Sequence, residues 1–120
     1  MQQMFAYSAF NGDISKWNTS SLTSAQAMFI ENSAFNGDIS NWNTSSLTSA
    51  AIMFTDASAF NGDLSRWDTS KVTDMRQMFY GASSFNRDIS SWNVALVDPG
   101  MAANFSDGSA LQDSYKPAFP

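Results

Sequence analysis

One phrase of 25 residues occurs four times along this chain, and it constrains the fold more than any other feature. Each copy opens on a phenylalanine and reaches a tryptophan at a constant offset. The openings are Phe10, Phe35, Phe60 and Phe85, and the tryptophans are Trp17, Trp42, Trp67 and Trp92. A fixed period of this length is typical of architectures in which each unit buries its apolar residues against its neighbours. We therefore expect these eight aromatic residues to form a core ladder.

The two halves of the repeated phrase predict different local structures. In the first half, Asn-Gly favours a turn, and the Ile and Trp that follow favour a short strand over residues 13–17 and their equivalents. In the second half, apolar residues recur at spacings of three and four, as in Val72, Met75 and Phe79, which predicts a short helix or 3₁₀ turn. The expected fold is an α/β repeat solenoid, a right-handed stack of about four coils, each with one short parallel strand.

The chain is expected to form a single domain over residues 1–120, with coils starting near residues 10, 35, 60 and 85. The segment 94–120 departs from the period. Phe105 lies one residue further from its tryptophan than Phe29 does, and Pro117 and Pro120 disfavour further strand pairing. We expect the solenoid to end there.

Composition excludes several classes of function. A net charge of −5 argues against nucleic acid as a partner. The absence of histidine and cysteine removes the usual zinc sites and the Ser-His and Cys-His nucleophiles. No apolar stretch has the length of a membrane span, so this segment is not expected to insert into a membrane. We expect no catalytic residue and no cofactor, calcium being the one weak alternative.

That alternative rests on four aspartates. Asp13, Asp38, Asp63 and Asp88 would stack about 4.8 Å apart between paired strands, where bare carboxylates repel one another. Either each accepts backbone N–H bonds in its own turn, or a cation column neutralises them. A glycosidase pair is disfavoured, because repeated residues have identical environments and such a pair needs two different ones.

Other columns have an ordinary and a functional interpretation. The tryptophans are expected to form a buried stack, with an exposed sugar-stacking ladder as the alternative. Turn hydrogen bonding is the ordinary role for Thr19, Thr44 and Thr69, and ice binding is the alternative. Asn-x-Ser/Thr sequons occur at Asn18, Asn43 and Asn104 and matter only in a eukaryotic secretory pathway.

Positions that vary between copies are the natural place for specificity. One such row, along the expected strands, is Lys16, Asn41, Arg66 and Ser91. A second, beyond the expected helix, is Ile30-Glu31, Thr55-Asp56 and Tyr80-Gly81. We predict that the first row forms a ligand or partner face; a plain solvated surface is the alternative for both.

The third copy carries a family resemblance. Its sequence Phe-Asn-Gly-Asp-Leu-Ser-Arg-Trp-Asp-Thr-Ser-Lys-Val-Thr-Asp-Met, residues 60–75, resembles the BspA-like, mycoplasma-lipoprotein type of 25-residue repeat, and the likeness covers about residues 1–111. The resemblance implies a leucine-rich-repeat-like solenoid in bacterial or protist surface proteins, with a role in adhesion. It implies no catalytic residue.

These observations predict a non-enzymatic, surface-exposed repeat module for adhesion, binding a protein or glycan ligand. The expected location is extracellular or at the cell surface. The alternative is a self-assembling structural protein, in which coils of separate chains stack end to end through the solenoid ends into an extracellular filament.

Overall fold

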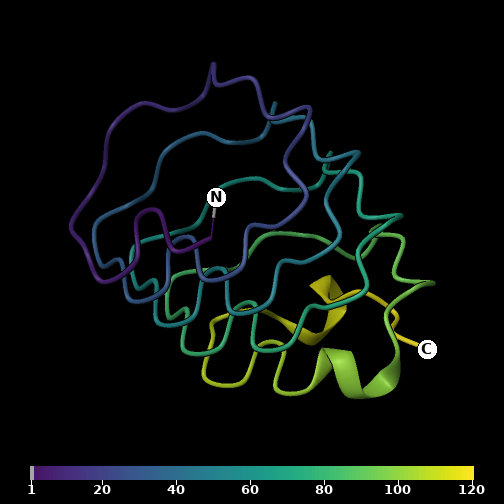
Figure 1. The fold of residues 1–120 in the computed structure, drawn as a ribbon. Coiled ribbons are helices and arrows are strands. Elements are labelled where there is room, and N and C mark those ends of the chain that lie inside the picture. The colour runs from purple at the N-terminus through teal and green to yellow at the C-terminus, as the bar shows by residue number, and fades with distance from the viewer. Residues whose placement is uncertain (1) are drawn as a thin grey trace.

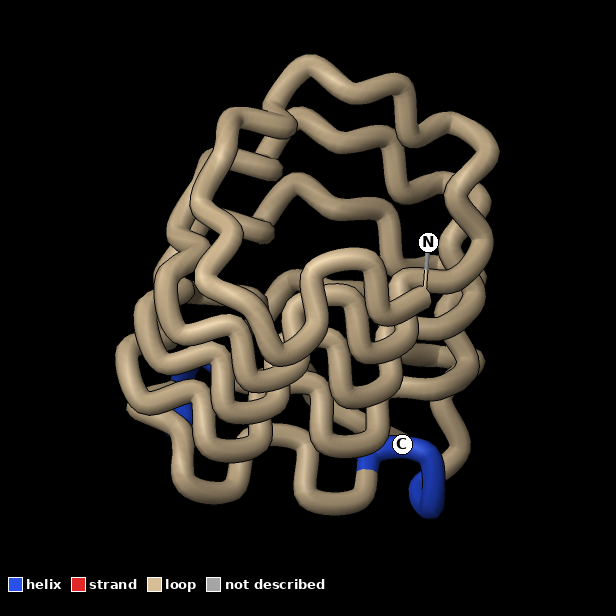
Figure 2. Tube along the Cα trace, turned by 60° about the vertical axis from the view of Figure 1, so that its left-hand side comes forward, coloured by secondary structure: helices blue, strands red, loops and turns tan. Residues whose placement is uncertain are grey.

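The computed structural model describes residues 2–120. Successive copies of the 25-residue phrase follow similar paths and lie beside one another, so that the chain proceeds from one end of the molecule to the other (Figures 1 and 2). The molecule measures 35 × 30 × 20 Å, with a radius of gyration of 12.7 Å. A radius of about 14 Å is usual for a globular chain of this length. The whole chain therefore packs as one compact globule.

The prediction of an α/β solenoid with parallel strands is wrong. Residues 2–120 contain two 3₁₀ helices, η1 at Pro99–Ala102 and η2 at Asp113–Tyr115, and neither an α-helix nor a sheet. Strand-like pairing is limited to two isolated parallel bridges, from Ser49 to Ser24 and from Ser49 to Asp74. The molecule is a globule of stacked turns and extended segments, and the leucine-rich-repeat-like description does not apply to it.

The strand expected at residues 13–17 is a turn. The Oδ1 atom of Asp13 accepts hydrogen bonds from the backbone N–H of Ser15 at 2.9 Å and from its hydroxyl at 2.7 Å. The Trp17 N–H donates back to the carbonyl of Ile14 at 3.2 Å. The aspartate side chain thus satisfies a backbone donor that a strand would use for pairing. This local competition bends the chain in place of a strand.

The expected helix is a series of tight turns. The Met28 N–H donates to Ala25 and the Asn32 N–H to Phe29, each three residues back, while Ala27 has a φ of 58° and Glu31 a φ of 52°. A left-handed third residue is the mark of type II turns and ends any α-helix. Such turns also bring residues three and four apart to one side. The apolar spacing therefore fits both structures.

Between these turns, alternate N–H groups bind the next copy. In the first copy the donors and acceptors are Ala25 to Ser49 at 3.0 Å, Ala27 to Ala51 at 3.0 Å, Phe29 to Met53 at 2.9 Å and Glu31 to Thr55 at 2.7 Å. The same four-bond pattern joins the second copy to the third and the third to the last. In residues 25–32, every second N–H group binds the next copy and the others bind within the segment, so the N–H groups that an α-helix would use internally are divided.

Aromatic columns fill the interior. The phenylalanines at the openings stack on one another at 5.9–6.3 Å, and a second column, Phe5, Phe29, Phe54 and Phe79, stacks at 5.5 Å. The two columns interleave with ring centroids 4.0–4.2 Å apart. Phe35, Phe60 and Phe85 are fully buried, whereas Phe10 at the end of its column is only partly buried.

The last copy has a register that differs from the one its spacing predicts. In the last copy, Phe105 occupies the position that corresponds to Met78 of the third copy, not the position that corresponds to Phe79. Its N–H closes a turn to Ala102, as that of Met78 does to Met75, and its ring meets Phe79 edge-on at 5.4 Å. The extra residues are accommodated by η1, which begins at Pro99. A proline fits the first position of such a helix because its missing N–H has no partner there anyway.

One fully buried polar residue secures the first copy. Asn32 donates from Nδ2 to the carbonyls of Phe10 at 3.2 Å and Phe5 at 3.4 Å. Its Oδ1 atom accepts the N–H groups of Ala34 and Phe35, each at 3.0 Å. Asn32 thus links residues 5–10 to the phenylalanine that opens the second copy.

Candidate functional site

The predicted ligand row lies exposed beside the column of aspartates. All four side chains, Lys16, Asn41, Arg66 and Ser91, face solvent. The charge of Lys16 lowers the pKa of Asp13, after the larger effect of the Ser15 hydrogen bonds. Arg66 acts in the same direction on Asp38 and Asp63. Row and column therefore form one continuous surface, which we call the polar face.

Each aspartate of the polar face is held by the serine two residues later. In the second copy, Oδ1 of Asp38 accepts the Ser40 hydroxyl at 2.6 Å and the Ser40 N–H at 3.0 Å. These bonds stabilise the ionised form and lower the pKa of Asp38 below its ordinary value. The pKa values of Asp13, Asp63 and Asp88 are lowered by the equivalent serine bonds. All four carboxyls are therefore charged at neutral pH.

An asparagine ladder borders the same face, and the sequence analysis missed it. The N–H of Asn36 donates to Oδ1 of Asn11 at 3.1 Å, and Asn61 and Asn86 continue the series at 2.9 Å. Gln112 closes it by donating its N–H to Asn86 at 3.0 Å. The invariance of this asparagine from copy to copy was the available signal.

Arg87 interrupts the glycine column of the polar face. Gly12, Gly37 and Gly62 hold this position in the other copies, and the fourth copy has arginine. The Arg87 side chain lies back over the third copy, where Nε donates to the Asn61 carbonyl at 2.9 Å. Arg87 lines both of the surface hollows that are described next.

Two hollows flank Arg87. The first, of 340 Å³, is lined by Asn36, Gly37, Asp38, Ser40, Asn61, Gly62, Asp63 and Arg87. The second, of 460 Å³, is lined by Asp63, Ser65, Asn86, Arg87, Asp88, Ser90, Ser91 and Tyr115. The second hollow thus joins Ser91 of the predicted row to Tyr115 of η2, which is partly buried against the core. Its lining offers donors, acceptors, charges of both signs and one aromatic side chain.

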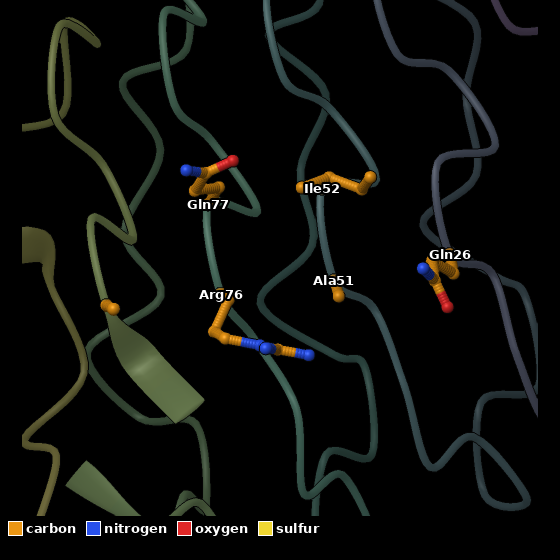
Figure 3. Close-up of a pocket in the computed structure, with 6 residues that line it drawn as sticks. Gln26, Ala51, Ile52, Arg76 and Gln77 are labelled. Atoms are coloured by element: carbon orange, nitrogen blue, oxygen red, sulfur yellow. The ribbon is translucent and has the colours of Figure 1, made fainter. Parts of the chain in front are cut away.

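A further pocket of 290 Å³ lies over the turns, in a region that neither predicted row includes (Figure 3). Gln26, Ala51, Ile52, Arg76, Gln77 and Ala103 line it. Arg76, the charged residue here, is already paired with Asp74 through Nη2 to Oδ2 at 2.6 Å and Nε to Oδ1 at 3.0 Å. Variation at these positions between copies was the signal that could have revealed the pocket. It offers fewer free polar groups than the polar face.

Most of the other side chains that the sequence offered as candidate sites are buried. Thr19, Thr44 and Thr69 are buried to within 3% exposure, so they form no exposed threonine array. Trp42, Trp67 and Trp92 are at most 5% exposed and stack on one another at 6.4 Å, each donating its indole N–H to a carbonyl of the preceding copy. Trp17 is 38% exposed. In the second row, Thr55 is buried and Tyr80 is exposed.

Within residues 2–120, no three acidic side chains come together in a way that could hold a metal ion. No helix in this part of the chain is long and apolar enough to span a membrane. The three sequon asparagines, Asn18, Asn43 and Asn104, are exposed.

Replacing Ser40 with alanine should raise the pKa of Asp38 toward 3.8, because the larger of its two stabilising bonds is lost. The lowered native pKa contributes stability above the unfolded value, about 3.9, and that contribution disappears as pH falls through the native pKa. The variant should therefore be less stable than the native chain at pH 7 and equal to it in strong acid. An NMR titration of the carboxyl carbon and urea unfolding at both pH values would measure this. Ser91→Ala is the control.

The model of the family described as "Mycoplasma protein of unknown function, DUF285" matches residues 1–117. No curated protein matches the chain, and neither does any solved structure. The mycoplasma part of the expected resemblance is confirmed, whereas this family is neither BspA-like nor a leucine-rich-repeat family.

Proposed function

Starting from the fact that the chain belongs to the DUF285 family of mycoplasma proteins, we propose that it is a non-enzymatic adhesion module at the cell surface that binds glycans through its polar face. The observation that carries the proposal is the 460 Å³ hollow between Arg87 and Tyr115. The sequence left protein and glycan ligands open. The chemistry of this hollow favours the glycan.

Saccharides present many hydroxyl groups and small apolar patches on their ring faces. An ionised carboxylate accepts hydrogen bonds from hydroxyls, an amide both accepts and donates them, and an arginine adds a fork of donors. Asp63, Asp88 and Asn86 supply the first two kinds of group and Arg87 the third, while Tyr115, partly buried against the core, completes the lining. The core of a protein–protein interface is depleted of charged residues, whereas Asp63, Asp88 and Arg87 all line this hollow.

The electrostatics support binding in preference to hydrolysis. A glycosidase needs one carboxylic acid that stays protonated near neutral pH beside a second that is ionised. Serine hydrogen bonds lower the pKa of every aspartate on the polar face, Asp63 and Asp88 included. With no carboxyl held in its acid form, the face has acceptors for hydroxyls but no proton donor for the leaving group.

The test is a glycan array, followed by calorimetric titration of the best ligand against the native chain and two variants. Arg87→Gly restores the glycine of the other copies and should weaken binding by about 10–100-fold, the cost of losing one hydrogen bond to a charged group. Lys71→Gly removes the same charge from an exposed position outside the hollows and should leave the affinity unchanged. A blank array, or equal loss in both variants, would refute glycan binding at this face.

A further inference from the structure

The two hollows of the polar face repeat one another. Five lining residues of the second hollow, Asp63, Ser65, Asn86, Arg87 and Asp88, each stand 25 positions after a lining residue of the first. Among these five pairs, only Arg87 differs in type from its equivalent, which is a glycine. Asp63 and Arg87 line both hollows, so the hollows adjoin. The polar face therefore presents nearly the same set of groups twice in succession.

The step from one hollow to the next is set by the stacking of the copies. Equivalent aromatic rings of the second, third and fourth copies stack at 5.5–6.4 Å, with interplanar angles of at most 6°. Because the rings are so nearly parallel, each copy is displaced from the previous one with little rotation, and the hollows repeat at a similar step. A sugar residue lengthens an extended glycan chain by a comparable distance. Successive residues of a linear glycan can therefore meet equivalent groups.

Each hollow keeps unused hydrogen-bonding atoms. Oδ1 of Asp38 and Oδ1 of Asp88 accept the serine bonds, while Oδ2 of each accepts no hydrogen bond within residues 2–120. Arg87 uses Nε on the Asn61 carbonyl at 2.9 Å, and its two terminal nitrogens donate no hydrogen bond in the same range. Sugar hydroxyls can donate to the first kind of atom and accept from the second. Both hollows thus have an open acceptor, and they share an open donor.

The charges of the polar face favour an uncharged ligand. Its four aspartates are ionised at neutral pH and outnumber its three cations, Lys16, Arg66 and Arg87, and the chain as a whole has a net charge of −5. A polyanionic chain laid along this face would therefore be repelled. Sugar hydroxyls carry no charge and still donate hydrogen bonds to carboxylates. A neutral glycan fits this face better than an acidic one.

We propose that the ligand is a neutral, linear glycan chain that lies along the polar face, with one sugar residue in each of the two hollows. This inference rests on the glycan-binding function proposed above and adds the class of glycan. Arg87 lines both hollows and can donate to both sugar residues. Once one residue is bound, the linked residue binds the adjoining hollow in an effectively intramolecular step. The protein therefore selects its ligand by length as well as by composition.

The test is calorimetric titration of the whole chain with cello-oligosaccharides and chito-oligosaccharides, two neutral linear series, from one to six sugar residues. The same length series is titrated for any other linear neutral glycan that the array detects. Affinity should rise about tenfold or more from the monosaccharide to the disaccharide, because the second sugar residue adds a few hydrogen bonds. Affinity should change little beyond the trisaccharide, because both hollows are then filled.

Asp38→Asn alters the first hollow alone and should weaken binding of the disaccharide and of longer chains by about five- to tenfold. The turn can hold the new side chain, since Asn43 accepts the Ser45 hydroxyl at 2.6 Å and the Ser45 N–H at 3.0 Å in the same way. Asp68→Asn is the matched control. Asp68 lies in a turn with the same pair of bonds to Ser70 and lines neither hollow, so its replacement removes the same charge and should leave every affinity unchanged.

The outcomes separate this inference from the function on which it rests. A monosaccharide that binds as tightly as its longer chains would overturn the two-hollow site and leave glycan binding in place. Array hits confined to acidic or branched glycans would overturn the neutral linear ligand in the same way. Equal losses for Asp38→Asn and Asp68→Asn would place the bound chain away from the first hollow. A blank array would overturn both this inference and the glycan-binding function.

Discussion

Phe60→Ala should lower the free energy of unfolding by about 3–5 kcal/mol, the usual cost of emptying a phenylalanine site in a core. Phe60 is fully buried, stacks on Phe54 at 4.1 Å, and lies between Phe35 at 6.0 Å and Phe85 at 5.9 Å. Backbone hydrogen bonds hold the neighbouring copies in place on either side of Phe60. Their side chains therefore cannot easily move in to fill the cavity. Urea unfolding monitored by circular dichroism would measure the loss.

Phe10→Ala is the matched control, because it occupies the same position at the end of the same column and is only partly buried. Its effect should be clearly smaller. Phe60→Leu, which keeps a large apolar side chain in the column, should cost about 1–2 kcal/mol and guards against a variant that fails to fold. Equal losses for Phe60→Ala and Phe10→Ala would contradict the stacked core.

Asn32→Asp should destabilise the chain by about 3 kcal/mol or more at neutral pH, the cost of an unpaired buried charge. The substitution keeps the acceptor for Ala34 and Phe35 but removes the donor to the Phe10 carbonyl. Burial raises the pKa of the new carboxyl above its unfolded value, about 3.9. The loss is therefore largest at high pH and diminishes as pH falls through the raised pKa.

Unfolding of this variant by urea at pH 4 and at pH 8 would show the expected difference in stability. Asn32→Ala is the control for the lost bonds, since it should destabilise by about 1–3 kcal/mol without this pH dependence. Alanine already stands at the equivalent positions Ala57 and Ala82, where it is fully buried. A loss for Asn32→Asp that does not change with pH would show that the new carboxyl is hydrated.

The aromatic columns were predictable from the sequence because a 25-residue period places identical residues at identical heights. The burial of Trp42, Trp67 and Trp92 follows from that alone, as does the stacking of the opening phenylalanines. The exposure of Trp17 does not follow, since it depends on what covers the end of the column. The burial of Thr19, Thr44 and Thr69 agrees with their expected structural role.

The secondary structure was not predictable in the same way. An apolar spacing of three and four occurs in a helix and also in successive turns with a left-handed third residue, and Ala27 and Ile52 give no signal of their left-handed φ. A glycine at such a position would have indicated a left-handed φ. Among the described residues with a positive φ, only Gly81 and Gly108 are glycines. The strand prediction failed because Asp13 captures the Ser15 N–H locally.

The polar face could be predicted in part. The row Lys16, Asn41, Arg66 and Ser91 was found by its variation, and the aspartate column by its constancy. Their union with Arg87 and Tyr115 into two hollows depends on how neighbouring copies and the last segment lie in space. Arg87 was visible as the one departure from glycine in its column, but its direction over the third copy was not.

The sequence by itself determined which side chains share a column. Repetition at a constant period puts the same residue at the same position in each copy, so equivalent side chains stack on one another. Only the tertiary structure decided how the backbone joins those columns. Each copy divides its N–H groups between its own turns and the next copy, and that division depends on neighbours being present. Burial near the ends was decided in the same way, since Phe119 packs edge-on against Phe105 while Met4, Tyr7 and Trp17 are exposed.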